Sequence, residues 1–491
     1  MAAASLDPRT PVLVGVGEAH RPVDGSGAVE PLELMVEASV AAAADAGAPS
    51  LLASVGMLAV PEGTWSYPDP GRLVAARIGA ERARTVCADV GVPQTAPLAV
   101  ALDRIRRGEL DVALVVGAEA MASTTAAQRA GGSVPETAQE GAVPDERWSP
   151  QGEIMADAEV QAGMWAPVDQ YACIENALGH AEGRPFDDQL DDIAGLWASF
   201  NAVATSNPLA AFPEPRTAAE LRVAGPGNRP LSSPYAKWHV SQWSVDQGAA
   251  LLLCSAGTAQ AAGVPADRWL FPHACVESEH MASLSRRAEL HRWPAMRILG
   301  HAVAAHIGRP LREVEVQEIY SCFPVAVRVQ QRELELDPTS PATVTGGMTF
   351  AGGPLNNFTY QATVEVARRL RAAPESLGMV TAVSGLLTKP GITVWGGCPA
   401  PEVLVADFGQ EAAAATATLE VTHGGAGPAT VATATATYEG DAPIRAFVIA
   451  DLPDGRRWVG TCHDPAFVQA ATRREVIGTT VEVRGAECAP A

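Results

Sequence analysis

The chain has 491 residues, and its 35 lysines and arginines stand against 56 aspartates and glutamates, which gives a formal net charge of −21. Hydrophobic residues make up 47% of the sequence, a composition typical of a globular protein and not of a disordered chain. The negative charge argues against nucleic acid as a partner, because phosphate binding requires clustered lysines and arginines. Length alone indicates about three domains.

No uncharged apolar run reaches the ~18 residues that a membrane-spanning helix needs, so we expect no membrane as a partner. The N-terminus lacks a basic segment followed by a long apolar stretch, so we also expect no signal peptide. The eight cysteines form no CxxC pair and have no histidine at metal-ligand spacing, which predicts neither a disulfide framework nor a metal site. These features favour a cytoplasmic location.

The first 123 residues alternate between short apolar runs and stretches with helical periodicity. Strands are predicted at 11–18, 53–60, 84–90 and 111–121, and helices at 31–46, 71–80 and 98–107. Such alternation predicts a parallel sheet covered by helices on both faces. A later apolar strand at 245–255, followed by a helix that ends at Gly263, returns to this unit, so residues 1–123 and 241–267 are predicted to form one half of the molecule.

The intervening residues 124–240 differ in composition. Residues 124–153 are polar and rich in Gly, Pro, Ser and Thr, which predicts a loop. Helices are predicted at 167–181 and 187–204, and a proline-rich stretch follows them. We interpret 124–240 as a loop domain that is inserted outside the sheet.

Residues 268–408 repeat the order of elements seen at the start of the chain. Strands are predicted at 269–278, 313–323, 378–386 and 391–398, with a helix at 292–307, a glycine-rich segment at 345–357 and a helix ending at Ala372. Two similar halves that flank an insertion predict a duplicated α/β fold.

The last residues, 411–491, form a further β-rich domain in this interpretation. Alternating or β-branched runs predict strands at 416–422, 429–439, 442–452 and 476–484, with one short helix near 464–472. Several short strands and a helix make a small β-barrel plausible, of the oligonucleotide-binding (OB) type. Because this segment has six arginines, no lysine and ten carboxylates, we favour a structural or docking module over a nucleic-acid binder.

Five segments, taken in order, resemble the thiolase superfamily over about 10–405. They are Ile105 with Gly108 and 111–123, the Ile174-Glu175-Asn176 motif, Asp246 to Ala250, Glu318 to Phe323, and Thr345 to Asn357. Segment 234–250 and the added C-terminal domain are most similar to thiolase-like proteins of type 1 in the acetyl-CoA acetyltransferase family. The resemblance implies a duplicated thiolase fold, layered α/β/α/β/α, and a role in lipid metabolism.

The same resemblance assigns the family's reactive positions to residues of this chain. The nucleophilic cysteine position falls on Gly91, the activating histidine position on Gly353, the second-cysteine position on Ser384, and the oxyanion position on Tyr320. Thiolase chemistry needs a thiolate, a base and a group that moves the α-proton. No catalytic residue of the usual set is intact, so we expect no ordinary thiolysis or Claisen condensation.

Candidate ligand contacts remain in a loop of four glycines and in one histidine. Gly346, Gly347, Gly352 and Gly353 would let the backbone approach CoA or an acyl-CoA closely, and His239 could contact the same ligand. A tight turn explains the glycines about as well, and His239 could instead make an interdomain hydrogen bond. We expect a small-molecule thioester as the partner, no permanently bound cofactor, and no metal.

Three functions are compatible with these residues. The first is the binding of an acyl-CoA without thiolase chemistry. The second is a retro-aldol lyase that uses Tyr320 as an acid or base, although a buried tyrosine bonded to a backbone carbonyl is the plainer interpretation of that residue. The third is a non-catalytic scaffold whose C-terminal domain docks a partner enzyme. Cys87, Cys322 and Cys398 are interpreted as non-catalytic, and both a monomer and a homodimer are compatible with the sequence.

Overall fold

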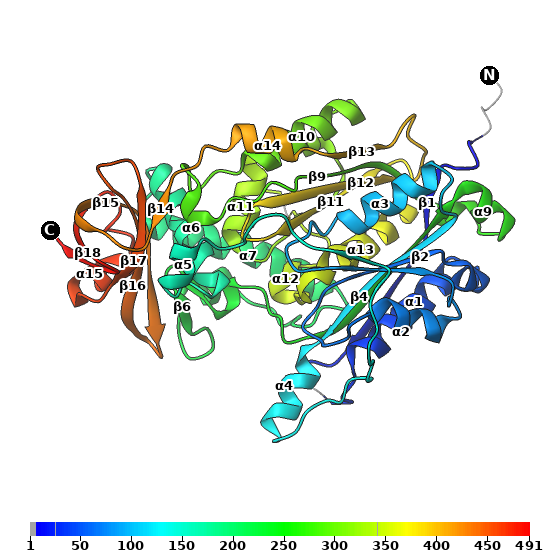
Figure 1. Cartoon of the computed structure of the whole chain (residues 1–491), viewed down its shortest axis with the longest axis horizontal. Helices are drawn as coiled ribbons and strands as arrows, with labels where there is room; N and C mark the ends of the chain where they lie inside the picture. The colour runs from blue at the N-terminus through cyan, green and yellow to red at the C-terminus, as the bar shows by residue number, and fades with distance from the viewer. Residues whose placement is uncertain (1–5, 25, 341) are drawn as a thin grey trace.

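The computed structural model of the chain describes residues 6–24, 26–340 and 342–491, and Figure 1 shows its architecture. The first five residues of the predicted segment 1–123 lie outside the described part. Two sheets form the body of the molecule, and a β-barrel built from the C-terminal residues lies at one end (Figure 1).

The first sheet has six strands in the order β1-β8-β4-β2-β3-β5. Their bounds are β1 Pro11–Arg21, β2 Met57–Pro61, β3 Arg84–Ala88, β4 Val112–Ala120, β5 Glu146–Trp148 and β8 Asp246–Ser255. The predicted parallel pairing is found among β2, β3 and β4, whereas β8 runs antiparallel to both β1 and β4 and makes the sheet mixed. The chain leaves β4 at Ala120, makes the long insertion, and re-enters beside the same residue at Asp246, so β8 must run in the opposite direction.

Helices cover both faces of this sheet, as predicted. The two on the outer face are α1 Pro31–Asp45 and α2 Pro70–Ile78, while α3 Ala96–Arg106 packs on the inner face. The start of α2 is fixed by the Asp69 side chain, which accepts a hydrogen bond from the Arg72 amide at 2.9 Å. Its end is fixed by Gly79, whose φ of 76° suits a left-handed cap.

Two predicted strands are shorter than their apolar patterns indicated. The start of the predicted strand 53–60 instead belongs to a 3-10 helix, η1 Pro49–Ser54, whose first residue, Pro49, has a φ that suits a helix. Strand β2 therefore starts only after Gly56. The predicted strand 313–323 is reduced to β10 Val316–Glu318. Beyond it the Tyr320 amide donates to the Thr381 side chain and not to a neighbouring strand.

The second sheet has the order β10-β11-β12-β9-β13. Its remaining strands are β9 Phe271–Glu277, β11 Leu377–Ser384, β12 Lys389–Gly396 and β13 Leu404–Asp407. Helix α13 Phe358–Ala372 lies with α3 between the two sheets, and α10 Pro294–Ile307 and α11 Pro324–Glu333 lie on the outer side. The body is therefore layered helix, sheet, helix, sheet, helix, which confirms the predicted duplicated α/β fold.

The insertion is less separate from the sheets than predicted. Its elements are α4 Met121–Arg129, β5, α5 Asp157–Gln161, α6 Pro167–Ala181, α7 Phe186–Ser206, α8 Ala218–Arg222, β6 Pro230–Ser232 and β7 Tyr235–Ala236. Strand β5, inside the stretch predicted as a loop, pairs with β3 and covers an edge that would otherwise be open. Strand β6 pairs with the C-terminal barrel at the other end.

The C-terminal residues form a closed barrel, as predicted. Its strands are β15 Ala426–Glu439, β16 Ala442–Asp451, β17 Arg457–Cys462, β18 Thr480–Arg484 and β19 Glu487–Pro490, with β14 Val421–Thr422, α14 Gly409–Ala415 and α15 Pro465–Ala471 beside them. Pairings run β15-β16-β17-β19-β18 and back to β15. The sequence patterns missed β17 because Gly460 interrupts its run of strand-forming residues. Glycine is needed at this position, since a Cβ there would collide with the Ala486 carbonyl.

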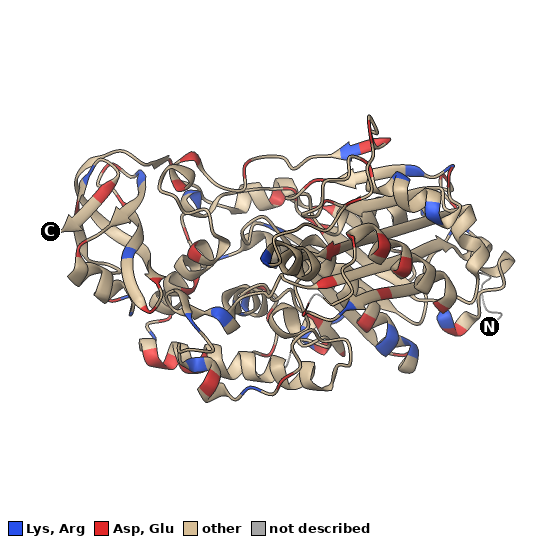
Figure 2. Ribbon diagram, turned by 90° about the horizontal axis from the view of Figure 1, so that it is seen from below, with Lys and Arg blue, Asp and Glu red and all other residues tan. Residues whose placement is uncertain are grey.

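Short elements complete the chain: η2 Lys237–His239, α9 Ala256–Ala261, η3 Ala266–Arg268, η4 Leu284–Arg286, η5 Leu311–Glu313, α12 Gly347–Phe350 and η6 Leu355–Asn357. Charged residues of both signs are spread over the body and the barrel (Figure 2). Within the described residues, no helix is both long enough and apolar enough to cross a bilayer.

Candidate functional site

The family's nucleophile position lies in the loop that leads into α3. Gly91 is buried and has a φ of +97°, a region that side-chain-bearing residues rarely adopt. A Cβ built on it would lie 3.2 Å from Pro150 and 3.2 Å from Ile154, both from the insertion. The position therefore has no thiol, and its surroundings leave little room for one.

Gln94, three residues further on, links this loop to two other elements. Its Nε2 donates to the Tyr320 hydroxyl at 3.2 Å and to the Val383 carbonyl at 3.1 Å, and its Oε1 accepts from the Thr359 hydroxyl. The Tyr360 hydroxyl donates to its backbone carbonyl at 3.0 Å. This buried amide joins the loop before α3, the end of β11 and the start of α13. The sequence offered a weak signal for it, a lone glutamine in an apolar stretch.

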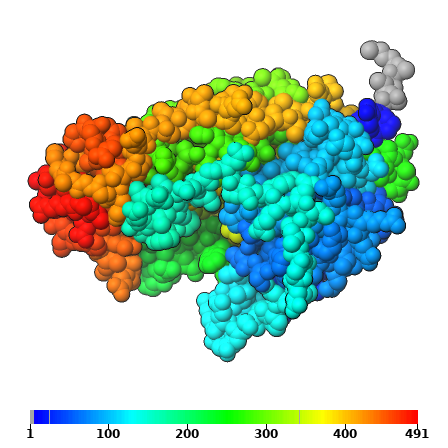
Figure 3. Space-filling view, viewed as in Figure 1, coloured from blue at the N-terminus to red at the C-terminus, as the bar shows by residue number. Residues whose placement is uncertain are grey.

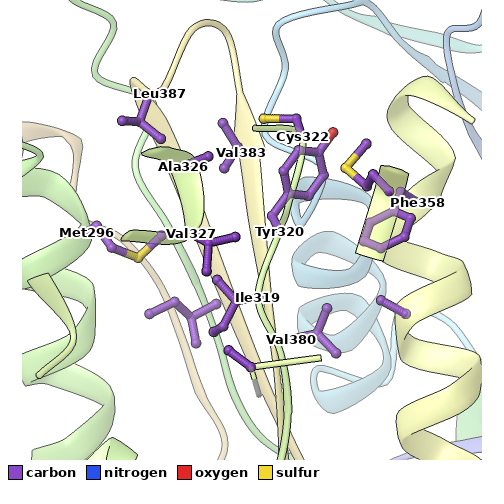
Figure 4. Packing of buried hydrophobic residues seen from close by; sticks show 14 of the residues in the cluster. Met296, Ile319, Tyr320, Cys322, Ala326, Val327, Phe358, Val380, Val383 and Leu387 are labelled. Atoms are coloured by element: carbon purple, nitrogen blue, oxygen red, sulfur yellow. The ribbon is translucent and has the colours of Figure 1, made fainter. Parts of the chain in front are cut away.

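Tyr320 lies among apolar side chains in the interior between the sheets (Figure 4). It is 6% exposed, and its ring meets that of Phe358 edge-on at 5.8 Å. Burial and the neighbouring Cys322 raise the pKa of its hydroxyl, so the group stays protonated. The hydroxyl oxygen accepts a hydrogen bond from Gln94 through a lone pair, so its own proton is left to donate.

Ser384, at the second-cysteine position, ends strand β11 and is 4% exposed. Its hydroxyl donates to the Val92 carbonyl at 2.9 Å. The structure thus brings Tyr320 and Ser384 into contact with the loop that contains Gly91. The serine proton, however, is held by a backbone carbonyl.

The glycine-rich loop is packed against protein on several sides. Gly353, at the histidine position, lies against the Ser241 hydroxyl, and its amide donates to the Gln242 carbonyl at 3.0 Å. Gly352 has a φ of +108° and lies against the Gln247 side chain. A side chain at any of these glycines would therefore displace a neighbouring segment.

The first two glycines of the loop are placed in a similar way. Gly346 has a φ of +102° and approaches Ala204 of α7 closely, and a Cβ on Gly347 would lie 2.8 Å from the Ser321 hydroxyl. The glycines let the loop pass close to α7 and to the residue after Tyr320. The glycine-rich loop is thereby held close to Ser321, the residue that follows Tyr320.

A buried carboxylate that the sequence patterns did not single out anchors this loop. Glu318 is 0% exposed and accepts hydrogen bonds from the Val344 amide at 2.7 Å, the Thr345 amide at 2.9 Å and the Thr343 hydroxyl at 2.9 Å. Burial raises its pKa to about 7. Its partners lie some 25 residues away along the chain, so no local pattern reveals the role.

His239 bonds within its own turn. It is 1% exposed, and its Nδ1 accepts a hydrogen bond from the Ala236 amide at 3.1 Å. Burial lowers its pKa to about 4, which keeps the imidazole neutral at physiological pH. Its ring lies 6.1 Å from that of Tyr235.

The cysteines near the candidate site are not activated. Burial raises the pKa of Cys87 to about 11 and that of Cys322 to about 12, whereas Cys398 is exposed beyond the end of β12. Across the described residues no thiol is hydrogen-bonded to an imidazole, and no cluster of three or more His, Cys, Asp or Glu side chains could hold a metal ion.

Four hollows in the described part of the chain are lined by residues other than Gly91, Tyr320, Gly353 and Ser384. One of these hollows, of about 20 Å³, lies beside the glycine-rich loop and is lined in part by Thr345. A hollow of about 400 Å³ runs along α10, and one of about 390 Å³ lies between the insertion and the barrel.

Comparisons with known proteins agree with this architecture. The model of the "thiolase-like protein type 1 additional C-terminal domain" matches residues 410–487. No curated protein sequence matches the chain. A monomeric SCP2-thiolase-like protein type 1 from Mycobacterium smegmatis is 26% identical, with a TM-score of 0.83, over 99% of this chain and 100% of that chain.

More distant structures share the fold of the body. The Ltp2-ChsH2(DUF35) aldolase is 18% identical with a TM-score of 0.60, over 79% of this chain and 98% of that chain. The dimeric peroxisomal thiolase of Saccharomyces cerevisiae is 13% identical with a TM-score of 0.55, over 80% of this chain and 98% of that chain. The layered body, the barrel and these similarities agree with one another: the chain has a thiolase-like fold and is similar to the type 1 thiolase-like proteins.

Proposed function

We propose that this protein binds a small-molecule thioester, CoA or an acyl-CoA, and does not carry out thiolase chemistry. The observation that carries the proposal is that three reactive positions of the thiolase fold hold residues that cannot do the family's chemistry. Where thiolase chemistry needs a nucleophile, a base and a second thiol, the chain has Gly91, Gly353 and Ser384.

The loss of chemistry follows from what these positions can do. Glycine has no group to acylate and no group to accept a proton. The Ser384 hydroxyl is a far weaker base than a thiolate, and its proton is already donated to the Val92 carbonyl. The buried thiols of Cys87 and Cys322 remain protonated near neutral pH, so neither replaces the missing nucleophile.

The ligand class is supported by the fold. Gln94 joins the loop after Gly91 to Tyr320, and Ser384 bonds to Val92 of the same loop, while Glu318 anchors the start of the glycine-rich loop. Such buried hydrogen bonds fix the relative positions of these loops.

Titration calorimetry on the full chain tests the proposal. Acetyl-CoA and S-acetylpantetheine, which has the thioester arm but no nucleotide, are each titrated to millimolar concentration while free thiol is monitored. We expect heat with both ligands and no release of thiol. An absence of heat with both would contradict thioester binding and leave the scaffold as the better account, and release of thiol would contradict the loss of chemistry.

A second candidate, a retro-aldol lyase acting on acyl-CoA adducts, is favoured by one observation. The Tyr320 hydroxyl accepts from Gln94 and keeps its own proton for donation. Replacement of Tyr320 by Phe removes only the hydroxyl oxygen, so any aldol cleavage through this group should be lost while the melting temperature stays within a few degrees of the wild type. Cleavage that survives Tyr320→Phe removes the tyrosine mechanism.

A further inference from the structure

The hollow of about 390 Å³ joins the insertion to the C-terminal barrel. On one side it is bounded by the turn between α6 and α7, and on the other by the residues that follow α15. The charged and aromatic residues among its lining are His180, Arg184, Phe186, Arg473, Arg474 and Glu475. Three guanidinium groups thus meet at one hollow of a chain whose net charge is −21.

Arg474 is the least solvated of the three arginines. It is 8% exposed, its Nη2 donates to the Arg184 carbonyl, and its Nη1 has no hydrogen-bond partner. Its φ of +56° is unusual for a residue with a side chain, and such strain is retained mainly where the surroundings require it. A buried guanidinium with an unused donor is costly to the folded state unless an anion approaches it.

A glycine in the lining of the hollow makes room for this guanidinium. Gly179 of α6 lies directly against the Arg474 Nη1, so any side chain at that position would displace it. The Gln189 Oε1 lies beside the same glycine and is also without a partner. A donor and an acceptor are therefore both left unused in the same buried place.

The other two arginines are fixed in position but remain accessible. The Nη2 of Arg473 lies 2.7 Å from Asp187, and Arg184 pairs with Asp192. Their side chains are 47% and 38% exposed, and each guanidinium has five N–H groups, so the ion pairs leave donors free. Glu475, 3.6 Å from Arg473, lies at the exposed rim.

We propose that this hollow binds a phosphate-bearing small molecule. The guanidinium fork matches two phosphate oxygens, and arginine holds its charge at any physiological pH. A volume of about 390 Å³ falls in the range of small-molecule sites, about 300–1,000 Å³, and exceeds what inorganic phosphate alone needs. Phe186, with the Arg473 guanidinium 5.3 Å from its ring centre, supplies an apolar wall for the rest of the ligand.

The proposal is independent of the thioester site, because it concerns a different set of residues at the junction with the barrel. It gives the added domain a function, since Arg473 and Arg474 come from the barrel and Arg184 comes from the insertion. A nucleotide and free phosphate share the chemistry that these arginines recognise, and the experiment separates them.

The test is calorimetry and thermal shift on the full chain at low ionic strength, with inorganic phosphate, ADP and adenosine as probes. We expect ADP to bind and to raise the melting temperature, inorganic phosphate to do so more weakly, and adenosine to have no effect. Arg473→Gln should weaken ADP binding about tenfold, the value for loss of one charge-assisted hydrogen bond. Arg456→Gln is the matched control, because Arg456 is 46% exposed on the same barrel and pairs with Asp454.

The outcomes that overturn the proposal are specific. They are an absence of ADP binding at millimolar concentration, or ADP binding that is equally strong in Arg473→Gln and Arg184→Gln. An equal stabilisation by chloride at the same ionic strength would also overturn it, since screening alone would then be the cause. Arg474→Gln should abolish binding, and if it fails to fold, the two exposed arginines still decide the question. S-acetylpantetheine binding that survives Arg473→Gln belongs to the thioester site and leaves this test unaffected.

Discussion

Position 91 combines two obstacles to a side chain. Its φ of +97° lies in the region that favours glycine, and Pro150 and Ile154 of the insertion lie 3.2 Å from where a Cβ would be. Both the backbone conformation at position 91 and the neighbouring insertion therefore leave little room for a cysteine side chain.

Restoring the cysteine should therefore not restore the enzyme. We predict that Gly91→Cys has no thiolase activity and is less stable than the wild type by about 1–3 kcal/mol, from backbone strain and overpacking. Differential scanning calorimetry and a thiolysis assay measure both effects. Gly424→Cys is the control, since no atom lies within 4 Å of a Cβ there and its stability should be almost unchanged. Thiolysis by Gly91→Cys would contradict this account of the site.

A buried carboxyl at the end of β4 predicts how stability depends on pH. Glu119 is 2% exposed and accepts a hydrogen bond from the Thr64 amide at 3.0 Å, and burial raises its pKa to about 7. The folded state therefore binds a proton more tightly than the unfolded state. Its contribution is fully present below a pH of about 4.5 and is lost as the pH rises through about 7.

We predict that the melting temperature falls as the pH rises from about 5 to about 7.5, and that Glu119→Gln flattens this fall. The contribution of this one group is at most about 3 kcal/mol. Melting curves over this pH range measure the slope, and Glu37→Gln, at a partly exposed carboxyl, serves as the control. An unchanged slope in Glu119→Gln would show that this carboxyl does not titrate there.

The family resemblance assigns individual reactive positions, and that assignment stays a prediction, whereas the network that joins these residues could not be predicted from the sequence. The spacing from Ile105 and Gly108 assigns the nucleophile position to Gly91. In the structure, the Ser384 hydroxyl donates to the carbonyl of Val92, the residue that follows Gly91. The role of Gln94 could not be predicted, because its partner Tyr320 lies 226 residues away along the chain and a hydrogen bond at that separation leaves no local pattern.

Strand β5 is the element with the clearest consequence for assembly. It adds to β3 in parallel, pairing Val86 with Glu146 and Ala88 with Trp148, and so occupies the edge through which a second copy could extend the sheet. The segment that carries it crosses the surface of the N-terminal half (Figure 3). The edge of this sheet is thus covered by the insertion.

We therefore predict a monomer. Light scattering coupled to size exclusion should give the mass of one chain, 51.0 kDa. Glu146→Arg, which would repel Arg104 and Arg84, should loosen β5 and increase the fraction of dimer. A dimer for the wild-type protein, with no change in Glu146→Arg, would contradict the role given to this strand.

Sequence patterns predicted elements well where burial sets the periodicity. The long helices at 167–181 and 187–204 are found as α6 and α7 almost to the residue. Patterns failed for β5 and β17, because a three-residue edge strand and a strand interrupted by Gly460 have too little alternation to be distinguished from loops.

At the scale of the molecule, the barrel is bound tightly to the body. The Thr433 hydroxyl donates to the Cys173 carbonyl at 2.7 Å, and the Asn176 side chain donates to the Ala434 carbonyl at 2.9 Å. Arg457 of the barrel bonds to the Arg287 carbonyl of the second half. Figure 1 shows the helices of the insertion between the sheets and the barrel, so the added domain is a structural part of the whole.

The duplicated layers were predictable because the order of elements repeats, and both halves place a helix, α3 and α13, between the sheets. The direction of β8 was not, since it depends on where the insertion returns the chain. The central prediction for the whole molecule is that a thiolase scaffold persists here without its covalent chemistry.

Intact-protein mass spectrometry after incubation with acetyl-CoA tests that claim most directly. Every thiolase reaction passes through an acyl group held on the enzyme's cysteine. We predict that the mass of the chain is unchanged, with no acetylated species at any incubation time. A population of chains with one acetyl group on a cysteine would contradict the predicted loss of covalent chemistry. Peptide mapping would then show which cysteine acts as the nucleophile in place of Gly91, which has no side chain to acylate.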